Sequence, residues 1–538
     1  MTKLLLILMM LIMLPGAQAS AQEAPTAILL SEDSITVDGG EIGSDPSSAV
    51  YLALQAETHE DVPEQLRTLR NRVVTITAAG TYHISGTASD AQIAVRAGAE
   101  DEVRLVLDGA HLSCRTAPAI AVYSARDTRI PGEYGVTIEL AQGSENTITG
   151  SHTVAEDDDG IEFDGAIGAQ VSLGFEGSGS LMVEADNEGI EVASGHMTIN
   201  GGRLSITAGD DPLNVSEDGF GVLTVNDGYV YSSVRPAAGG EGDGIDSNGY
   251  IVFNGGTVIN LAHPDSQDGG IDSDMGSTIN GGVIVGAGNM YDPIEADSEQ
   301  LFMMLEFGQE TDSLVVVTDE KDVPVFAYDF PHDYMYIAFS TPQLREGVYH
   351  VYLGGEIEGE QENGLYTSIT SYIPGERMQH GEGNAAQRTR AGGEAPGRGG
   401  FDPMAAQAPG RGGFGPMAEQ APDMDGFSRE MDAYMAYQQA LTVLDLNTLL
   451  ADADLNELLK GLDLNSLLTG FDVTELLTED QIARYFTGID LEAAQRFSAM
   501  DFGGRGGMRG MTSSAEVATT DFALSRSSTG FTNVRAAD

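Results

Sequence analysis

Two short motifs alternate along the central part of this 538-residue chain, and they limit its possible folds more than any other feature. The first motif places an aliphatic residue after Gly or Pro, between acidic or amide residues, at Ile161, Ile190, Leu213, Ile245, Ile271 and Ile294. The second places Asn before a Gly-containing turn, at Asn200, Asn226, Asn254 and Asn280. Successive aliphatic positions are 23 to 32 residues apart. Such a period is typical of a solenoid, in which stacked turns share one core.

The residues between the motifs predict β-strands as the repeating unit. Leu204-Ser205-Ile206 and Val258-Ile259-Asn260 alternate in polarity, and glycine-rich turns separate such runs. We therefore predict an all-β fold whose main part is a right-handed parallel β-helix. The alternative is a β-sandwich with accidental repetition. In the β-helix, the asparagines are expected to stack into a hydrogen-bonded row.

Changes in composition divide the chain into seven segments. These are a signal peptide over residues 1–21, a lead-in segment over 22–72, the parallel β-helix over 73–297, a small antiparallel β module over 298–374, a flexible Gly/Pro/Met-rich linker over 375–439, a short α-helical, Leu-rich repeat region over 440–500, and a disordered tail over 501–538. Within the lead-in, Val50–Arg72 is expected to include a short helix.

The N-terminus predicts export. Lys3 precedes the apolar run Leu4–Leu14, and Ala17-Gln18-Ala19 forms an A-x-A cleavage site. We expect a secreted or cell-surface protein without membrane insertion; an uncleaved anchor is the alternative. Near the other end, Asp445-Leu446-Asn447 begins a nine-residue repeat, which predicts short Asp-capped helical turns. That region could mediate self-association or pack on itself.

The charge of the chain excludes several kinds of partner. The sequence contains 83 acidic and 26 basic residues, a formal net charge of −57, which excludes binding to nucleic-acid phosphates. Between Asp157 and Asp297 there are 25 acidic residues but only two basic ones, Arg203 and Arg235. The single cysteine, Cys114, excludes an intramolecular disulfide framework and a thiolate zinc cluster. Divalent cations are the partners that this composition favours.

The repeats also predict where those cations bind. If the aliphatic residue of each motif points inward, the acids before and after it bracket one corner of each turn. One column is expected to contain Asp159, Glu188, Asp211, Asp243 and Asp292, and the other Glu162, Glu191, Asn214, Asp246, Asp272 and Glu295. Stacked strands lie about 4.8 Å apart, so these carboxylates must raise their pKa or bind a cation.

Oxygen ligands at this density suit Ca²⁺. The predicted metal ligands are Asp158, Asp159, Glu162, Asn187, Glu188, Glu191, Asp211, Asn214, Asp243, Asp246, Asp268, Asp272, Asp274, Asp292 and Glu295. The alternative is a solvated acidic face whose aspartates cap turns. No catalytic or carbohydrate-binding residue is assigned, although the tyrosines Tyr229, Tyr231, Tyr250 and Tyr291 are candidates for stacking on sugar rings.

The two motifs resemble those of a family of exported bacterial proteins described as carbohydrate-binding domain-containing proteins. That family is characterised by DDGI(D/E/K) and TI(N/T/E)GG strings. Asp243-Gly244-Ile245-Asp246 and Thr278-Ile279-Asn280-Gly281-Gly282 are similar to them. The resemblance covers about 300 residues, 73–374, and implies a pectate-lyase-like parallel β-helix, Ca²⁺ sites and binding to plant-type polysaccharide. Proline replaces glycine at Pro212 and Pro293.

Several functions are compatible with these features. The first is a secreted, calcium-dependent protein that binds cellulose or acidic pectic chains without catalysis. The second is a pectate-lyase-like polysaccharide lyase, which needs a basic side chain as proton acceptor. Neither Arg203 nor Arg235 lies in the bracketing pattern, which disfavours the lyase. A glycoside hydrolase and a glycan-independent surface or adhesion protein are further alternatives.

Overall fold

The computed structural model describes residues 24–55, 64, 66–67, 69–152, 161–237, 239–295, 298–311, 314–381, 522–524 and 532–536. The described residues form strands and turns, with no helix among them, and they belong to one compact unit of the chain. The all-β prediction is confirmed, with two large sheets made mostly of parallel strands. The expected signal peptide (1–21) and Leu-rich helices (440–500) lie outside the described residues.

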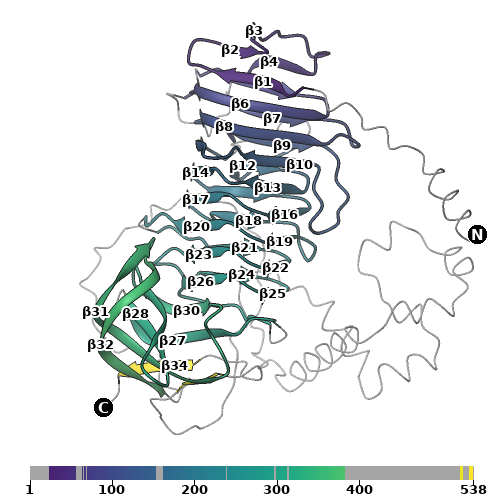
Figure 1. The fold of residues 1–538 in the computed structure, drawn as a ribbon. Helices are drawn as coiled ribbons and strands as arrows, with labels where there is room; N and C mark the ends of the chain where they lie inside the picture. Colours follow the sequence, from purple (N-terminus) through teal and green to yellow (C-terminus); the bar gives the residue numbers. More distant parts are fainter. Residues whose placement is uncertain are drawn as a thin grey trace, which may run out of the picture. The chain divides into compact units, whose positions relative to one another are not determined.

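Three ladders run through the stack of turns, parallel except for the antiparallel pair that begins the first, and each turn of the chain adds one strand to each (Figure 1). The first ladder contains β4 (Val50–Gln55), β5 (Asn71–Ile76), β7 (Ala91–Arg96), β9 (Ile120–Ser124), β12 (Gly165–Ala169), β15 (Glu188–Val192), β18 (Leu213–Val215), β21 (Asp246–Ser247) and β24 (Asp272–Ser273). The second contains β10 (Val136–Leu140), β13 (Leu173–Gly177), β16 (His196–Ile199), β19 (Val222–Val225), β22 (Tyr250–Phe253) and β25 (Gly276–Ile279). The third contains β11 (Glu145–Gly150), β14 (Ser180–Ala185), β17 (Arg203–Ala208), β20 (Tyr229–Val234), β23 (Thr257–Leu261) and β26 (Val283–Gly288).

The N-terminal end of the stack is built from longer strands. β8 (Val103–Ser113) pairs with both β10 and β11, so the second and third ladders begin from one strand. β6 (Gly80–Ala88) lies between β8 and β1 (Thr26–Leu30), and β2 (Ile35–Val37) and β3 (Gly40–Glu41) form antiparallel pairs beyond them.

The lead-in segment is therefore part of the stack. The short helix expected within Val50–Arg72 does not include either end of that range, because Val50–Gln55 is strand β4 and pairs with β5, which begins at Asn71. Most of the residues between these strands lie outside the described residues. Val50 and Leu52, two residues apart and therefore on one side of the strand, pack against the core, whereas Leu54 is exposed. Pairing with the first ladder therefore determines the structure at both ends of this range.

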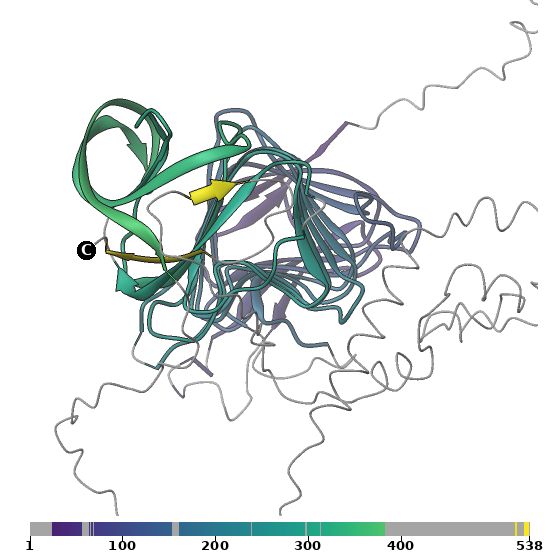
Figure 2. The same ribbon diagram turned by 90° about the horizontal axis from the view of Figure 1, so that it is seen from below.

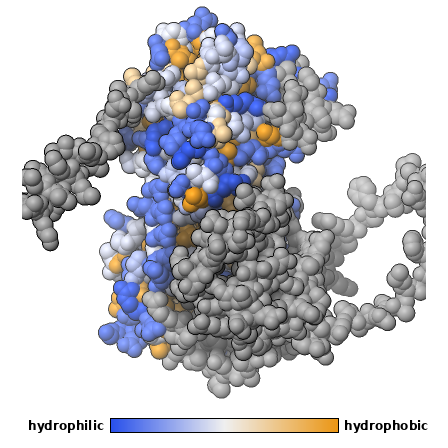
Figure 3. Space-filling view, turned by 90° about the vertical axis from the view of Figure 1, so that its right-hand side faces the viewer, coloured by the Kyte–Doolittle hydropathy of each residue, from blue (hydrophilic) through white to orange (hydrophobic). Residues whose placement is uncertain are grey.

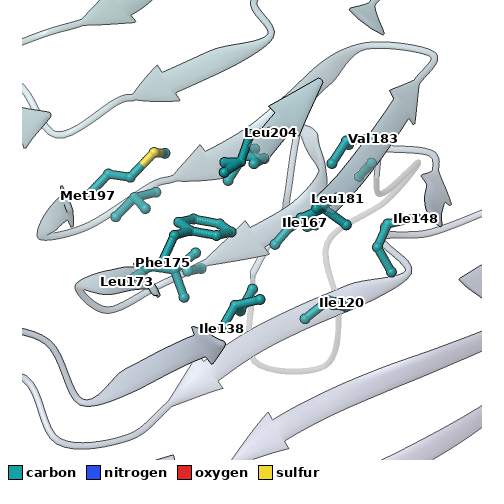
Figure 4. Packing of buried hydrophobic residues seen from close by; sticks show 14 of the residues in the cluster. Ile120, Ile138, Ile148, Ile167, Leu173, Phe175, Leu181, Val183, Met197 and Leu204 are labelled. Carbon is teal, nitrogen blue, oxygen red and sulfur yellow. The ribbon is translucent and has the colours of Figure 1, made fainter. Parts of the chain in front are cut away.

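The core is formed by side chains that point inward at the same level of successive strands (Figure 4). In the first ladder, Ile120, Ile167, Ile190 and Leu213 are in direct register, and all four are fully buried. Phe175 and Leu181 pack from the other two ladders. No single turn could bury these side chains alone, so the turns stabilise one another.

The second motif forms a turn that is stacked four times. Asn226 donates its side-chain amide to Asn200, Asn254 donates to Asn226 and Asn280 donates to Asn254, at 2.7–2.8 Å. The predicted row of amides is thus confirmed. The residue two positions after each asparagine is a glycine with positive φ, between 77° and 101°. A Cβ on Gly228 or Gly282 would also lie 2.7 Å from a carbonyl oxygen of the preceding turn, which explains the requirement for glycine.

A β module follows the stack and is mainly antiparallel. It contains β27 (Phe302–Thr311), β28 (Leu314–Asp319), β29 (Pro324–Asp329), β30 (Tyr334–Ser340), β31 (Gly347–Glu362), β32 (Leu365–Gly381), β33 (Phe522–Leu524) and β34 (Thr532–Ala536). β30 pairs with β26, so the module continues the third ladder. Viewed from below, the turns of the stack overlap, and β31 and β32 curl beside them (Figure 2).

Two predicted boundaries differ from the structure. The linker was expected to begin at residue 375, but β32 continues to Gly381 because it pairs with β31 and β34. The tail 501–538 was expected to be disordered, but β33 pairs with β31, and β34 pairs with β27 and β32. The local sequence of these short segments does not indicate strands, and pairing with strands distant in the sequence holds them in the sheet.

Within the described ranges, the structure contains no helix with the length and hydropathy that a membrane crossing requires. The face in Figure 3 is mainly hydrophilic where it is coloured, with single apolar side chains scattered over it.

The amide row should contribute measurably to stability. We expect Asn226→Ala, which removes two inter-turn hydrogen bonds, to lower the free energy of unfolding by about 1–2 kcal/mol. The measurement is thermal or urea denaturation. Asp227→Ala is the control, because this exposed side chain bonds only the neighbouring Gly228 amide among the hydrogen bonds described. Equal stability of the two variants would contradict a stabilising role of the row.

Candidate cation-binding edge

Four of the predicted ligands lie in one column of the first ladder. Glu191 pairs with Asn214, Asn214 with Asp246, and Asp246 with Asp272, each in direct register. Each side chain follows an inward aliphatic residue and points to the other side of its strand. The register therefore places three carboxyl groups and one amide at successive levels of one edge.

Two residues expected in this column lie elsewhere. The residue opposite Glu191 in the preceding turn is Gly168, so Glu162 is six positions away from the column and is exposed. Ile167, not Ile161, occupies the inward position of that turn. The motif around Ile161 therefore has the composition of the repeat, but it does not occupy the repeat's position in the ladder. Asp158 and Asp159 lie outside the described residues.

At the C-terminal end of the column, the last turn of the chain no longer follows the first ladder. Ile294 forms a bridge with Ser277 of the second ladder, and the exposed Glu295 lies beside Gly276. Pro293, which has no backbone N–H to donate to the first ladder, precedes this change of partner. Glu295 is thus separated from Asp272, although the sequence pattern placed it directly below.

The acids before the aliphatic positions bind the backbone of a neighbouring turn. Asp211 accepts the Asp243 N–H at 2.7 Å, and Asp243 accepts the Gly269 N–H at 2.6 Å. Asp268 accepts the N–H of Gly242, one turn earlier, at 2.6 Å. Each hydrogen bond engages one oxygen of a carboxylate that has two. The turn-capping role that was the alternative to metal binding is therefore present.

Three carboxylates approach closely enough to share a cation. One oxygen each from Asp243, Asp246 and Asp272 lies within 4.8 Å of the other two, and all three side chains are half-buried. Asp292 from the last turn contacts Asp272 through a hydrogen bond between the two carboxyl groups, and it accepts the Ser273 N–H at 3.0 Å. We call the eight residues on this side of the stack the acidic edge: Glu188, Glu191, Asp211, Asn214, Asp243, Asp246, Asp272 and Asp292.

Burial and mutual repulsion perturb these acids strongly. Burial, followed by the hydrogen bond and charge of Asp272, raises the pKa of Asp292 to about 8. Burial and then the charges of Asp272 and Asp211 raise the pKa of Asp243 well above its usual range. Burial also raises the pKa of Glu191 to about 7. Burial and mutual repulsion thus favour the protonated form of all three groups, and a bound cation would favour the charged form.

A second group of oxygens comes from the two turns that precede Asp243 and Asp246 in the stack. Glu188 is buried, and burial followed by the charges of Glu191 and Asp211 raises its pKa well above the usual range. Its Oε1 accepts the amide of Asn214 at 2.8 Å. Its Oε2 and the Asn214 Oδ1 are buried without a hydrogen-bond partner. Unsatisfied buried acceptors are costly, and a cation would satisfy both.

The remaining predicted ligands contribute less. Asn187 donates to the backbone oxygen of Asp164 at 3.4 Å, which is a structural role. Asp274 is exposed, and its pKa is raised by partial burial and by Asp272 and Asp218. Sequence reasoning missed Asp164, whose backbone N–H binds Glu191 and whose charge raises the pKa of that residue. In the sequence, only the position of Asp164 immediately before a strand could have indicated this role.

Residues 70–300 match the family model described as "Carbohydrate-binding domain-containing protein". The resemblance expected from the repeats is confirmed over this region. The acidic edge lies entirely inside it. A curated protein from Acetivibrio thermocellus with the same description is 34% identical over 139 residues. That alignment covers 26% of this chain and 46% of the relative, so the chain spans less than half of the relative's length.

A solved structure also aligns with part of the chain. It is described as the polysaccharide lyase-like protein from C. thermocellum, gadolinium derivative, and is 23% identical with a TM-score of 0.32. The alignment covers 48% of this chain and 94% of the solved chain.

The raised pKa values predict an unusual pH dependence of stability. For Glu191 and Asp292, the folded-state pKa of about 7 and about 8 exceeds the ordinary value, so their stabilising contribution is present in acid and is lost as pH rises through these values. In chelator, we expect the melting temperature to fall by on the order of 5 °C between about pH 5 and about pH 8.5.

The measurement is differential scanning calorimetry in chelator across this pH range. Adding Ca²⁺ should restore most of the loss at the alkaline end and have little effect at the acid end, where the ligands are protonated. A melting temperature that rises steadily with pH in chelator would contradict this account of the acidic edge.

Proposed function

We propose that this is an exported, calcium-dependent carbohydrate-binding protein that binds plant-type polysaccharide, either cellulose or acidic pectic chains, without catalysis. We further propose that residues 73–297 form a right-handed parallel β-helix and that the acidic edge is its cation-binding side. The observation that carries the proposal is the approach of Asp243, Asp246 and Asp272 within the region that matches the carbohydrate-binding family.

The chemistry of the acidic edge supports calcium. All the donors are hard oxygens from carboxylates and one amide, and successive turns of the stack supply them. Ca²⁺ accepts six to eight oxygen ligands in flexible geometry, whereas Mg²⁺ demands a regular octahedron. Asp243, Asp246 and Asp272 would hold one ion, and Glu188 with Asn214 would contribute to a second. A bound Ca²⁺ would supply open coordination positions for sugar hydroxyl or uronate oxygens.

Binding without catalysis is supported by the position of the basic residues. Arg203 forms an ion pair with Glu362 and lies over the ring of Tyr229, on the third ladder. Arg235 donates to the backbone oxygen of Ala185. Neither guanidinium is described in contact with the acidic edge, where a lyase would need a proton acceptor beside the cation. Export and self-association through residues 440–500 are parts of the proposal that need their own tests.

Removing ligand charges should weaken calcium binding without unfolding the protein. We expect Asp243→Asn with Asp272→Asn to weaken calcium binding at this site at least about tenfold, because two of three charges are lost. Isothermal titration calorimetry of the full chain measures the affinity. Glu184→Gln is the matched control, because it removes one charge from an exposed position on the third ladder. Unchanged affinity in the double variant would contradict the cation site.

Polysaccharide binding should depend on calcium. We expect retention of the full chain on cellulose or on polygalacturonate in calcium, and loss of retention in chelator and in the double variant. Absorbance of unsaturated uronides should not increase when polygalacturonate is incubated with the protein and calcium. An increase in this absorbance would identify the protein as a lyase and contradict binding without catalysis. Equal retention with and without chelator would refute the calcium dependence.

A further inference from the structure

The outward side of the second ladder presents a regular, uncharged surface over its last three turns. β19, β22 and β25 lie side by side in direct register, and their inward side chains are buried in the core (Figure 1). Outside the core lie three columns, which are Val222, Tyr250 and Gly276; Thr224, Val252 and Thr278; and Asn226, Asn254 and Asn280. We call these nine residues the neutral face. None of the nine is charged, although the chain carries a formal net charge of −57.

Tyr250 supplies an aromatic surface on the neutral face. It is 43% exposed, and its partner in the next turn is Gly276, which has no side chain to lie against the ring. The other tyrosines that the sequence suggested for stacking on sugar rings are less accessible. Tyr229 and Tyr231 pack against the β module, and Tyr291 is half-buried. The structure therefore selects Tyr250 as the stacking residue among the four.

The asparagine row supplies hydrogen-bonding groups beside this ring. A side-chain amide has two hydrogens and two oxygen lone pairs. Within the row, Asn226 and Asn254 each donate one hydrogen bond and accept one. Both side chains are exposed, so each has a further hydrogen and a further lone pair to offer a ligand. These groups recur at about 4.8 Å, the spacing of stacked strands, and sugar hydroxyls both donate and accept.

Glu295 borders the neutral face at its C-terminal end. Its backbone N–H donates to Ser277 at 2.7 Å, and its Oε1 lies 2.6 Å from the position that a Cβ on Gly276 would occupy. The exposed carboxylate, which the structure separates from Asp272, thus lies beside the second ladder. It can accept hydrogen bonds from sugar hydroxyls, and its charge disfavours an anionic ligand.

The neutral face depends on the acidic edge for its position. Only Asn248 and Gly249 separate β21, which carries Asp246, from β22. Only Asp274 and Met275 separate β24 from β25. Cations that hold the carboxylates of the first ladder together therefore also support the turns that carry the neutral face. Binding to an uncharged surface can depend on calcium for this reason.

We propose that the neutral face binds an uncharged, extended polysaccharide such as cellulose, with a sugar ring on Tyr250 and hydroxyl groups toward the amides of Asn226 and Asn254 and the carboxylate of Glu295. The inference rests on the proposed carbohydrate-binding function, and it selects the neutral chain from the two substrate classes. A neutral partner complements nine uncharged residues on a strongly acidic chain. The surface is open, and three turns span about 10 Å, so a segment of chain lies along it without an enclosed pocket.

Two variants of the full chain test the neutral face. We expect Tyr250→Ala to reduce the affinity for cellohexaose about tenfold in isothermal titration calorimetry in calcium, because it removes the stacking surface. Val252→Glu places a charge in the central column and should reduce the affinity similarly, whereas Tyr250→Phe should retain binding. The matched controls are Tyr51→Ala, at the N-terminal end of the stack, and Met182→Glu, at an exposed position of the third ladder. Calcium affinity and melting temperature should be retained in every variant.

The outcomes separate this inference from the proposed function. If the unaltered protein binds no polysaccharide in calcium, the proposed function fails and this inference fails with it. If the unaltered protein binds polygalacturonate but not cellohexaose, or if Tyr250→Ala and Val252→Glu bind cellohexaose as tightly as it does, only the neutral face is overturned. Loss of cellohexaose affinity in both variants, with calcium affinity and melting temperature retained and both controls unaffected, supports the neutral face as the binding surface.

Discussion

The hydrogen bonding between consecutive turns is the constraint on which the rest of this structure depends. A parallel ladder in register places chemically similar residues of the repeat directly above one another, whatever their charge. Along the core, this register aligns aliphatic side chains and is favourable. Along the asparagine row, it aligns donors with acceptors. Along the acidic edge, the same register brings together groups that repel one another, and only protons or cations can neutralise them.

The polar and apolar parts of the repeat therefore have different consequences. The same backbone geometry that buries Ile190 beside Leu213 also places Glu191 beside Asn214 and Asp246 beside Asp272. The substitution of an amide for one acid in the column reduces the repulsion at that level. The chain thus combines a stabilising core with an edge whose charge is unfavourable in isolation, a combination common at binding sites.

Periodicity was sufficient to predict the all-β fold, the amide row and the alignment of Glu191, Asn214, Asp246 and Asp272, because each depends on repeated local spacing. It was insufficient where the spacing varied. The Ile161 motif has the composition of the repeat, yet Ile167 occupies its place, and Pro293 accompanies a shift of the last turn to another ladder. The β4 strand and the C-terminal strands pair with distant partners, which a local pattern does not reveal.

The C-terminal strands have a consequence for the covalent continuity of the protein. The chain leaves the β module after Gly381 and rejoins it at Phe522, and β34 lies between β27 and β32. A single proteolytic cut between those two points would separate the polypeptide into two pieces without separating the sheet that both pieces build. The shorter piece would dissociate only when the hydrogen bonds of β33 and β34 break, so a nicked protein would still migrate as one particle under native conditions.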